Sequence, residues 1–250
     1  MNATETVLVT PHLWEEPIRA EIFGIERLEQ HAESLAVAQG AAAERFKGRN
    51  LLPRVRDNAK VLLSGYRDVA ETVREKREIT PAAEWLLDNF HIVEEQIRGI
   101  RDHLPGGYYR RLPKIAEGHL SGYPRVYGLA WAYVAHTDSR FDLETLQRFV
   151  SAYQRGQPLT IGELWAVAIH LRIALVENLR RLSQLIVRSR KGRASADEMA
   201  DRLLGLSGRP VESVEEVFGP LADAKLRRPF SVQLVQRLRD QGPSILPAVD

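Results

Sequence analysis

The chain has 250 residues, of which 44% are hydrophobic and 27% are charged, and these values are ordinary for a globular protein. Its formal net charge is only +2, and basic residues are interspersed with acidic ones, so we expect no nucleic-acid partner. The absence of cysteine excludes disulfides, thiolate catalysis and cysteine-based zinc sites within this sequence. The longest nearly uncharged apolar stretch, 126–135, is much shorter than the roughly 20 residues of a membrane span. We therefore expect this piece itself to be soluble.

Apolar residues recur with the period of an α-helix along most of the chain, and no useful stretch alternates as a strand does. In chain order the pattern predicts helices over 18–39, 54–77, 80–101, 125–136, 143–155, 160–189, 195–206 and 230–240. The prediction is an all-α, bundle-like fold of about seven to nine helices with no sheet. We expect residues 1–207 to form a helical domain with its core at 80–190. Residues 208–250 are predicted to be a short helical extension leading to a downstream region.

Short capping sequences predict where several helices begin. Thr80 precedes a proline, and its hydroxyl can accept a hydrogen bond from a free amide of the first turn. Thr160 and Glu163 form a capping box, in which each side chain bonds to the amide of the other residue. Ser195 and Glu198 repeat this pattern, so a new helix is predicted to begin there.

One polar stripe on the predicted helix 80–101 has the residue types of a metal site. Glu84, Asp88, His91 and Glu95 follow one another at helical spacing. A two-metal site in a helix bundle needs a second carboxylate–histidine pair on another helix, and the sequence has no second copy. We expect a solvated or arginine-paired stripe. A metal-dependent helical enzyme that uses Asp88, His91, Glu95 and His170 is the alternative.

A second polar group lies on the predicted helix 160–189. Glu163 and His170 are seven residues apart and therefore share one side of the helix. Because buried charges must be paired, we expect a buried polar network that joins them to Asp88 or His91 of the helix 80–101. A binding site and a catalytic site are the alternatives at the same residues.

The aromatic residues divide into two groups. Five lie on predicted helices and are expected to anchor the core: Trp85, Phe90, Trp131, Tyr133 and Trp165. The others gather with arginines in and just after the predicted connection 108–124, and they are Tyr108, Tyr109, Arg110, Arg111, Tyr123, Arg125 and Tyr127. We expect this second group to form a contact surface for a partner. Stacking of its tyrosines on sugar rings is the alternative.

A basic run lies near the predicted end of the helix 160–189. Its members are Arg188, Arg190, Lys191 and Arg193. Cations are stabilised at the C-terminal end of a helix by the helix dipole, which explains the run without a ligand. Contact with anionic lipid head groups is the functional alternative.

Several long phrases of the chain carry a family resemblance. Those between residues 80 and 182 read TPAAEWLLDNFHIVEEQI, GGYYRRLPK, GYPRVYGLAWAYVAHTDSRFD and QPLTIGELWAVAIHLRIALVENLRRL. Further phrases lie at 16–39, 51–63 and 228–241, so the resemblance covers nearly the whole chain. The sequence resembles the N-terminal region of cyclic β-1,2-glucan synthases, which are very large bacterial membrane glycosyltransferases.

The resemblance implies a helical region joined, in the whole enzyme, to membrane spans, a glycosyltransferase domain and a phosphorylase-like domain. It implies UDP-glucose and a divalent cation for that enzyme and a location on the cytoplasmic side of the bacterial inner membrane. The chain has no Asp-x-Asp or Gln-x-x-Arg-Trp motif, so no catalytic residue of the family can be assigned to it. We expect a non-catalytic domain that packs against the glycosyltransferase or membrane region of the same polypeptide. An autonomous protein that binds β-1,2-glucan through Tyr108, Tyr109, Tyr123 and Tyr127 is the alternative.

Overall fold

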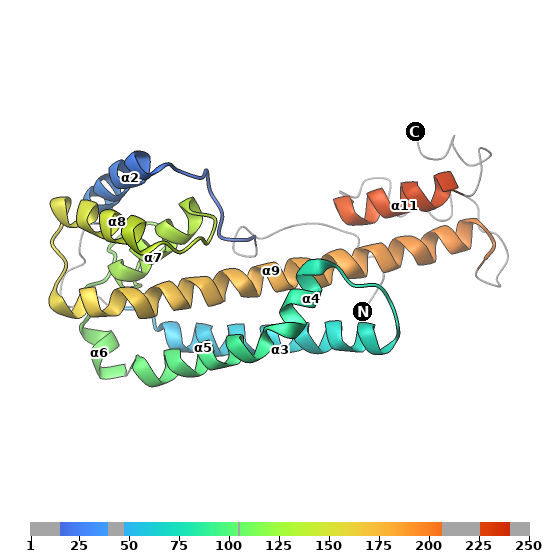
Figure 1. Ribbon diagram of the computed structural model, residues 1–250, viewed down its shortest axis with the longest axis horizontal. Coiled ribbons are helices and arrows are strands. Elements are labelled where there is room, and N and C mark those ends of the chain that lie inside the picture. The colour runs from blue at the N-terminus through green and yellow to red at the C-terminus, as the bar shows by residue number, and fades with distance from the viewer. Residues whose placement is uncertain (1–15, 40–47, 105, 207–225, 241–250) are drawn as a thin grey trace. The chain divides into compact units, whose positions relative to one another are not determined.

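The computed structural model describes residues 16–39, 48–104, 106–206 and 226–240, and this part of the chain is helical (Figure 1). Its helices are α2 (Ile25–Ala38), α3 (Leu51–Arg74), α4 (Pro81–Asp88), α5 (Phe90–His103), α6 (Gly106–Arg111), α7 (Arg125–His136), α8 (Leu143–Gly156), α9 (Ile161–Leu203) and α11 (Arg228–Asp240). Within these ranges the extended pairing amounts to an isolated bridge between Lys114 and Pro124, and no strand forms. The predicted all-α fold is confirmed.

The chain divides into two compact units, which are described separately. One unit comprises residues 17–183, and the other comprises residues 184–250 together with 1–16. Helix α9 contributes its first part to the larger unit and its second part to the smaller one. The predicted boundary at residue 207 stays a prediction. Of the predicted extension 208–250, residues 226–240 lie within the described part of the chain.

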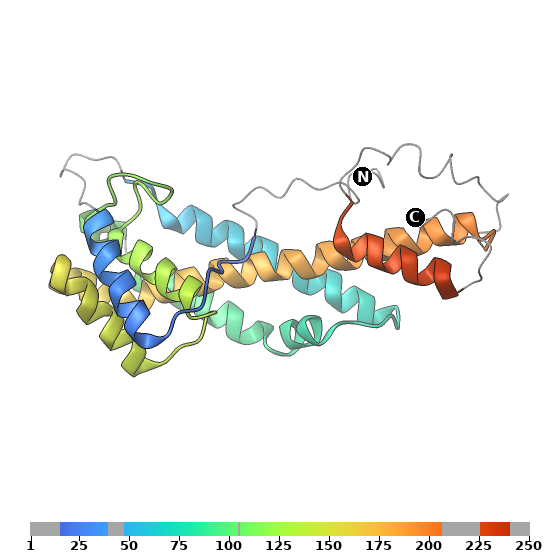
Figure 2. The same cartoon turned by 90° about the horizontal axis from the view of Figure 1, so that it is seen from above.

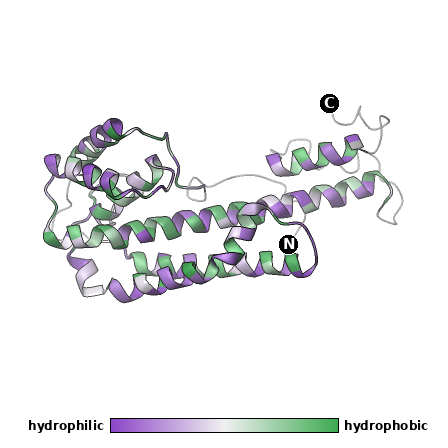
Figure 3. Cartoon of the chain, viewed as in Figure 1, coloured by the Kyte–Doolittle hydropathy of each residue, from purple (hydrophilic) through white to green (hydrophobic). Residues whose placement is uncertain are grey.

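The larger unit has a continuous apolar core. Helices α3 and α5 lie along the first part of α9, and α2, α7 and α8 lie side by side near the beginning of α9 (Figures 1 and 2). Hydrophobic residues alternate with hydrophilic ones around most helices (Figure 3), as expected when one face of each helix is buried. The largest completely enclosed side chains of this core include Tyr153, Phe149, Leu62, Ile100 and Ile173.

Helix α7 is the central helix of this core, and it ends where the sequence predicts. Ten of its residues are buried, because the segment is apolar on all sides rather than on one face. Its glycine, Gly128, lies against other side chains so closely that an added Cβ would come within 2.7 Å of Ile115 Cδ1. A larger residue at position 128 would force those neighbours to move.

Helices α2 and α8 pack closely along each other. A Cβ added to Gly156 of α8 would lie 2.9 Å from the Cβ of Ala36 on α2, so the small residues permit the approach. Beside this contact Glu33 accepts a hydrogen bond from Arg155 at 2.7 Å. The packing fixes α2 against the helices that carry the polar core.

Three local predictions differ from the structure. The predicted helix 80–101 is two helices, because the side-chain amide of Asn89 donates to the carbonyl of Trp85 and competes with the helical pattern. The predicted helices 160–189 and 195–206 are one continuous helix, α9, so Ser195 does not begin a new helix. The predicted connection 108–124 contains the short helix α6 before it becomes irregular.

The described part of the smaller unit is a pair of helices, the second part of α9 and α11. Its apolar contact consists of Ala196, Ala200, Leu203, Phe230, Leu234 and Leu238. Polar pairs lie beside this contact: Gln233 donates to Asp197 at 2.8 Å, and Arg237 donates to Asp201 at 2.6 Å. The order of these pairs along both segments shows that the two helices run in the same direction.

Candidate functional site

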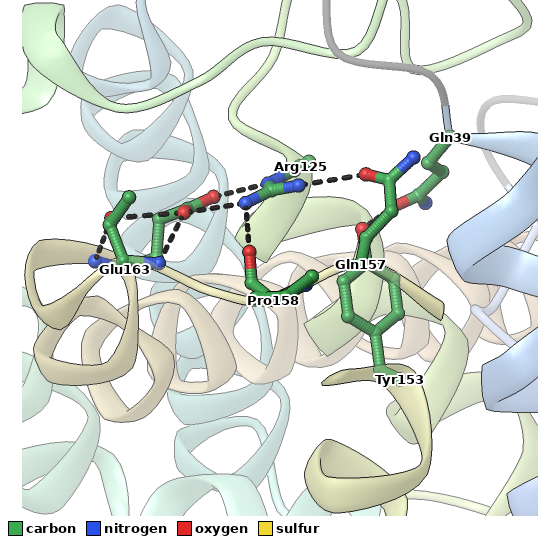
Figure 4. A network of polar contacts seen from close by, with 7 residues as sticks. Gln39, Arg125, Tyr153, Gln157, Pro158 and Glu163 are labelled. Carbon is green, nitrogen blue, oxygen red and sulfur yellow. Dashed lines mark hydrogen bonds and ion pairs between the residues drawn. The ribbon is translucent and has the colours of Figure 1, made fainter. Parts of the chain in front are cut away.

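A buried ion pair lies where α7 begins against the beginning of α9. The guanidinium of Arg125 donates to both carboxylate oxygens of Glu163, with distances of 2.5 and 2.8 Å (Figure 4). The side chains are 8% and 0% exposed, so water scarcely reaches either charge. A bidentate pair of this kind satisfies two donors and two acceptors at once and fixes the orientation of both groups.

The same carboxylate closes the first turn of α9. Glu163 accepts hydrogen bonds from the backbone amide and the hydroxyl of Thr160, both at 2.9 Å. In return the amide of Glu163 donates to the Thr160 hydroxyl at 3.2 Å, which completes the predicted capping box. Burial raises the pKa of Glu163, but the hydrogen bonds from Arg125 and Thr160 outweigh burial and lower the pKa overall.

The remaining donors of Arg125 bind the connection between α8 and α9. They reach the side-chain oxygen of Gln157 at 2.7 Å and the carbonyl of Pro158 at 2.9 Å. The hydroxyl of Tyr153 donates to the side chain of Gln39 at 3.3 Å nearby (Figure 4). Arg125 thus joins α7, the 157–158 connection and α9. Each of its contacts holds one of these segments in place.

A second buried carboxylate, Glu177, lies further along α9 and faces α3. Arg54 donates to its two oxygens at 2.8 and 2.6 Å, and Asn58 donates at 2.7 Å. Arg181, one turn further along α9, donates at 2.9 Å. Burial raises the pKa of Glu177, but the hydrogen bonds from Arg54 and Asn58 outweigh it and lower the pKa to about 2. This group joins two helices that are far apart in the sequence.

A histidine and a lysine are also buried in the larger unit. His170 is completely buried, and its Nδ1 donates to the carbonyl of Ala166 at 2.8 Å. Burial, together with the charge of Lys114, lowers the pKa of His170 to about 4, although the Ala166 carbonyl acts in the opposite direction. Lys114 donates to the carbonyl of Tyr109 at 2.7 Å and lies 4.2 Å from the centre of that ring. Burial lowers the pKa of Lys114 to about 8.

The predicted tyrosine–arginine surface is largely interior. Tyr109, Arg125 and Tyr127 are buried, because their rings and guanidinium are enclosed by α7, α9 and the connection before α7. The hydroxyl of Tyr109 donates to the carbonyl of Arg49 at 2.5 Å. Burial raises the pKa of both tyrosines. These three residues therefore hold the fold together, and a contact surface or glucan site built on them is not supported.

The other members of that predicted set lie nearer the surface. Tyr123 is half-buried and packs edge-on against Tyr127. Tyr108 is half-buried, and its hydroxyl donates to the carbonyl of Gly162 in the first turn of α9. Arg110 and Arg111 are exposed on α6.

The predicted polar stripe does not meet the buried carboxylates. Asp88, His91 and Glu95 are exposed, whereas Glu163 and His170 are enclosed in the core. The buried network instead recruits Arg54 and Asn58 of α3, so the expectation that it involves Asp88 or His91 was wrong. Among the described residues no three histidine or acidic side chains are placed to hold a metal ion.

Two further predictions require correction. The basic run at Arg188, Arg190, Lys191 and Arg193 lies within α9, which continues to Leu203, so the dipole of a helix end does not explain it. Trp85 and Trp165 were expected in the core, but they are 52% and 80% exposed. Of the same aromatic group, Phe90 and Tyr133 are buried, and Trp131 is half-buried against the core.

Sequence reasoning missed three residues of the polar core. Arg54 and Asn58 were assigned no polar partner, and Lys114 was assigned to an irregular connection. One signal could have found Asn58: it occupies an apolar position of the α3 pattern, between Val55 and Leu62, and all three are buried. A polar residue on the core side of a helix requires a partner from elsewhere.

In this core the buried charged groups are paired with donors or acceptors of the fold. Both carboxylates are ionised, buried and saturated by arginine, hydroxyl, amide or asparagine donors, so neither is placed to transfer a proton to a substrate. The contacts of this core connect helices.

Comparison with known proteins shows which proteins the chain resembles in sequence. No protein-family model matches it. It is 39% identical, over 233 residues, to the cyclic beta-(1,2)-glucan synthase NdvB of Rhizobium meliloti (strain 1021). The chain is related to the cyclic β-1,2-glucan synthases. The predicted resemblance is thereby confirmed, and the match covers 92% of this chain but only 8% of the length of the Rhizobium synthase.

The chain therefore spans less than a tenth of the length of the synthase that it matches. Among the described helices of this synthase-related chain, none combines the length and the apolar character that a membrane crossing demands.

Proposed function

We propose that this chain is a non-catalytic helical region of a cyclic β-1,2-glucan synthase, which supports synthesis of cyclic β-1,2-glucan from UDP-glucose by the whole enzyme. The 39% identity to the Rhizobium synthase supports the connection to that enzyme. One observation carries the non-catalytic assignment: both buried carboxylates, Glu163 and Glu177, are saturated by donors within the fold. An acid or base for glycosyl transfer must keep a proton or a lone pair available to the substrate.

In this proposal the glycosyltransferase and membrane region of the same polypeptide is the partner of the helical region. UDP-glucose and the divalent cation bind in that region and not in this chain. The proposal places the helical region on the cytoplasmic side of the bacterial inner membrane. Its polar core gives it a rigid shape, because Arg125 and Glu177 each tie together segments that are distant in sequence.

The test uses a synthase that contains this region, with radiolabelled UDP-glucose as substrate and cyclic glucan as product. Removal of residues 17–183 should abolish or strongly reduce synthesis, and supply of the 250-residue chain as a separate polypeptide should restore part of it. Alanine at Asp88, His91 and Glu95 together should leave synthesis within about twofold of the unmodified enzyme, because exposed side chains away from chemistry contribute little.

Two results would contradict the proposal. Full synthesis without residues 17–183 would mean that the region does not support the enzyme. Binding of UDP-glucose by the isolated 250-residue chain at micromolar concentration, measured by calorimetry, would mean that it holds substrate itself.

A further inference from the structure

One surface of the larger unit combines exposed apolar side chains with exposed arginines. The first turn of α9 carries Ile161, Leu164 and Trp165, and α6 carries Arg110 and Arg111; we name these five residues the α6–α9 cap. Trp165 is 80% exposed, Ile161 is 73% exposed and Leu164 is 39% exposed.

The two halves of the cap are held together by a specific contact. Tyr108 lies on α6 between the glycines and the arginines, and its hydroxyl donates to the carbonyl of Gly162. A Cβ added to Gly162 would lie 3.7 Å from the Tyr108 ring, an ordinary contact distance, so the two segments touch. The contact therefore places α6 beside the first turn of α9.

The charge of the cap is entirely positive. Neither Arg110 nor Arg111 forms an ion pair with a described residue. The single acid in residues 106–111 and 158–165 is Glu163, whose carboxylate points inward to Arg125 and is 0% exposed. Because Arg125 holds the Glu163 carboxylate inside the fold, this acid does not compensate Arg110 and Arg111, and the cap combines two exposed arginines with exposed Trp165, Ile161 and Leu164.

This combination matches the edge of an anionic lipid bilayer. Tryptophan prefers the level of the head groups, and aliphatic side chains can enter the acyl boundary. Arginines beside them are attracted to the negative surface potential of anionic lipids. A sugar site would instead need carboxylates and amides around the aromatic ring to bind hydroxyls, and the residues of the cap offer none.

We propose that the α6–α9 cap docks on the surface of an anionic phospholipid membrane. Trp165, Ile161 and Leu164 enter the head-group region, and Arg110 and Arg111 contact lipid phosphates. This membrane contact differs from the one considered as the alternative for Arg188, Arg190, Lys191 and Arg193. It concerns the isolated chain and lipid, so it stands or falls independently of glucan synthesis.

The experiment is flotation of the 250-residue chain with vesicles, supported by tryptophan fluorescence. One set of vesicles contains phosphatidylcholine and phosphatidylglycerol in equal amounts, and the other contains phosphatidylcholine alone. We expect binding to the first set, weakening with added salt, and a blue shift of tryptophan emission. Trp165→Ala should abolish the shift and weaken binding by about tenfold, and the double variant Arg110→Glu, Arg111→Glu should weaken binding by at least about tenfold.

Matched controls separate the cap from general charge and hydrophobicity. Trp85→Ala removes another exposed tryptophan, on α4, and the double variant Arg56→Glu, Arg67→Glu reverses two exposed arginines of α3. Both controls should bind within about twofold of the unmodified chain, because lipid contact is confined to the cap. Equal losses in cap and control variants would overturn the inference. So would an unmodified chain that ignores anionic vesicles, and the cap would then fit an acidic protein partner instead.

Discussion

Glu163 and Glu177 lie on the same helix about four turns apart, and both are buried, ionised and bound by arginine. Their partners differ in origin. Glu163 is held partly by its own helix end, through Thr160, and partly by Arg125 of α7. Glu177 is held by Arg54 and Asn58 of α3, more than a hundred residues earlier, and by Arg181 of α9.

The difference in partners shows that the two buried carboxylates have different structural roles. At Glu163 the carboxylate completes a local helix start, and the ion pair adds an anchor for the connection after α8. At Glu177 the carboxylate has no local capping task, and its hydrogen bonds from Arg54 and Asn58 fix α3 against α9. The second group therefore contributes to the arrangement of the helices more than the first, and its loss removes an acceptor that Arg54, Asn58 and Arg181 share.

The largest expected effect is at Glu177. The variant Glu177→Ala removes the carboxylate that buried Arg181, buried Asn58 and half-buried Arg54 share. We expect a loss of about 4 kcal/mol in the free energy of unfolding, because removing one partner of a buried ion pair is strongly destabilising. Urea unfolding followed by circular dichroism measures it.

The exposed carboxylate Glu95 supplies the control for that measurement. Glu95→Ala should change the free energy of unfolding by less than about 0.5 kcal/mol. If Glu177→Ala were as mild as Glu95→Ala, the group around Glu177 would not join α3 to α9.

A smaller effect is expected at the other carboxylate. Glu163→Ala removes one acceptor of Arg125, which keeps Gln157 and the Pro158 carbonyl as partners. We expect a loss of about 3 kcal/mol in the free energy of unfolding. The measurement is the same urea titration, made in parallel with Glu177→Ala.

A double-variant cycle tests whether the pair acts as a unit. Arg125→Met alone should also destabilise, and the double variant Arg125→Met, Glu163→Ala should lose clearly less than the sum of the single losses. Strict additivity would show that the carboxylate acts through Thr160 alone and that the ion pair with Arg125 contributes nothing.

The same contrast explains what the sequence could predict. The capping box at Thr160 and Glu163, the helix of α7 and the all-α class follow from patterns within a few residues. The partners of Glu177 could not be found this way, because Arg54 and Asn58 come together with it only after α3 packs on α9. At two places, Asn89 and Ser195, the structure also differs from the helix boundaries that the local pattern predicts.

Both differences have a physical cause. Asn89 divides α4 from α5 because its side chain binds the Trp85 carbonyl, a competition that a periodicity pattern does not register. The capping sequence at Ser195 failed because Ala196, Ala200 and Leu203 continue the buried face of α9 against α11. Packing along the helix thus outweighed a helix-start signal.

The buried histidine of the larger unit should also respond to acid. The folded-state pKa of His170 is about 4, below the ordinary value of 6.5. The group therefore stabilises the fold in full above pH 6.5, and this contribution is lost as the pH falls from 6.5 through 4. We expect a total loss on the order of 3 kcal/mol in the free energy of unfolding across that window.

Two variants isolate the histidine in that measurement. His170→Leu should flatten the dependence between pH 6.5 and 4, which urea titrations at several pH values can follow. His31→Gln is the control, because burial and the charge of His136 also lower the pKa of His31, and this variant should leave the dependence due to His170 in place. Glu177, with a pKa of about 2, contributes its own loss below pH 4.5. An unchanged slope in His170→Leu would contradict the assignment.

The smallest expected effect separates the local part of the Glu163 group from its ion pair. Thr160→Ala removes the hydroxyl that caps α9 but leaves the contact between Glu163 and Arg125 intact. We expect a loss of about 1 kcal/mol in the free energy of unfolding, the usual value for a capping residue. Thr160→Ser keeps a hydroxyl and should lose little. Thr80→Ala should lose less than Thr160→Ala, because the Thr80 hydroxyl accepts a single long bond of 3.4 Å from Ala83. If Thr160→Ala cost as much as Glu163→Ala, the cap would account for the whole effect of the carboxylate, and the distinction between its local and long-range partners would be lost.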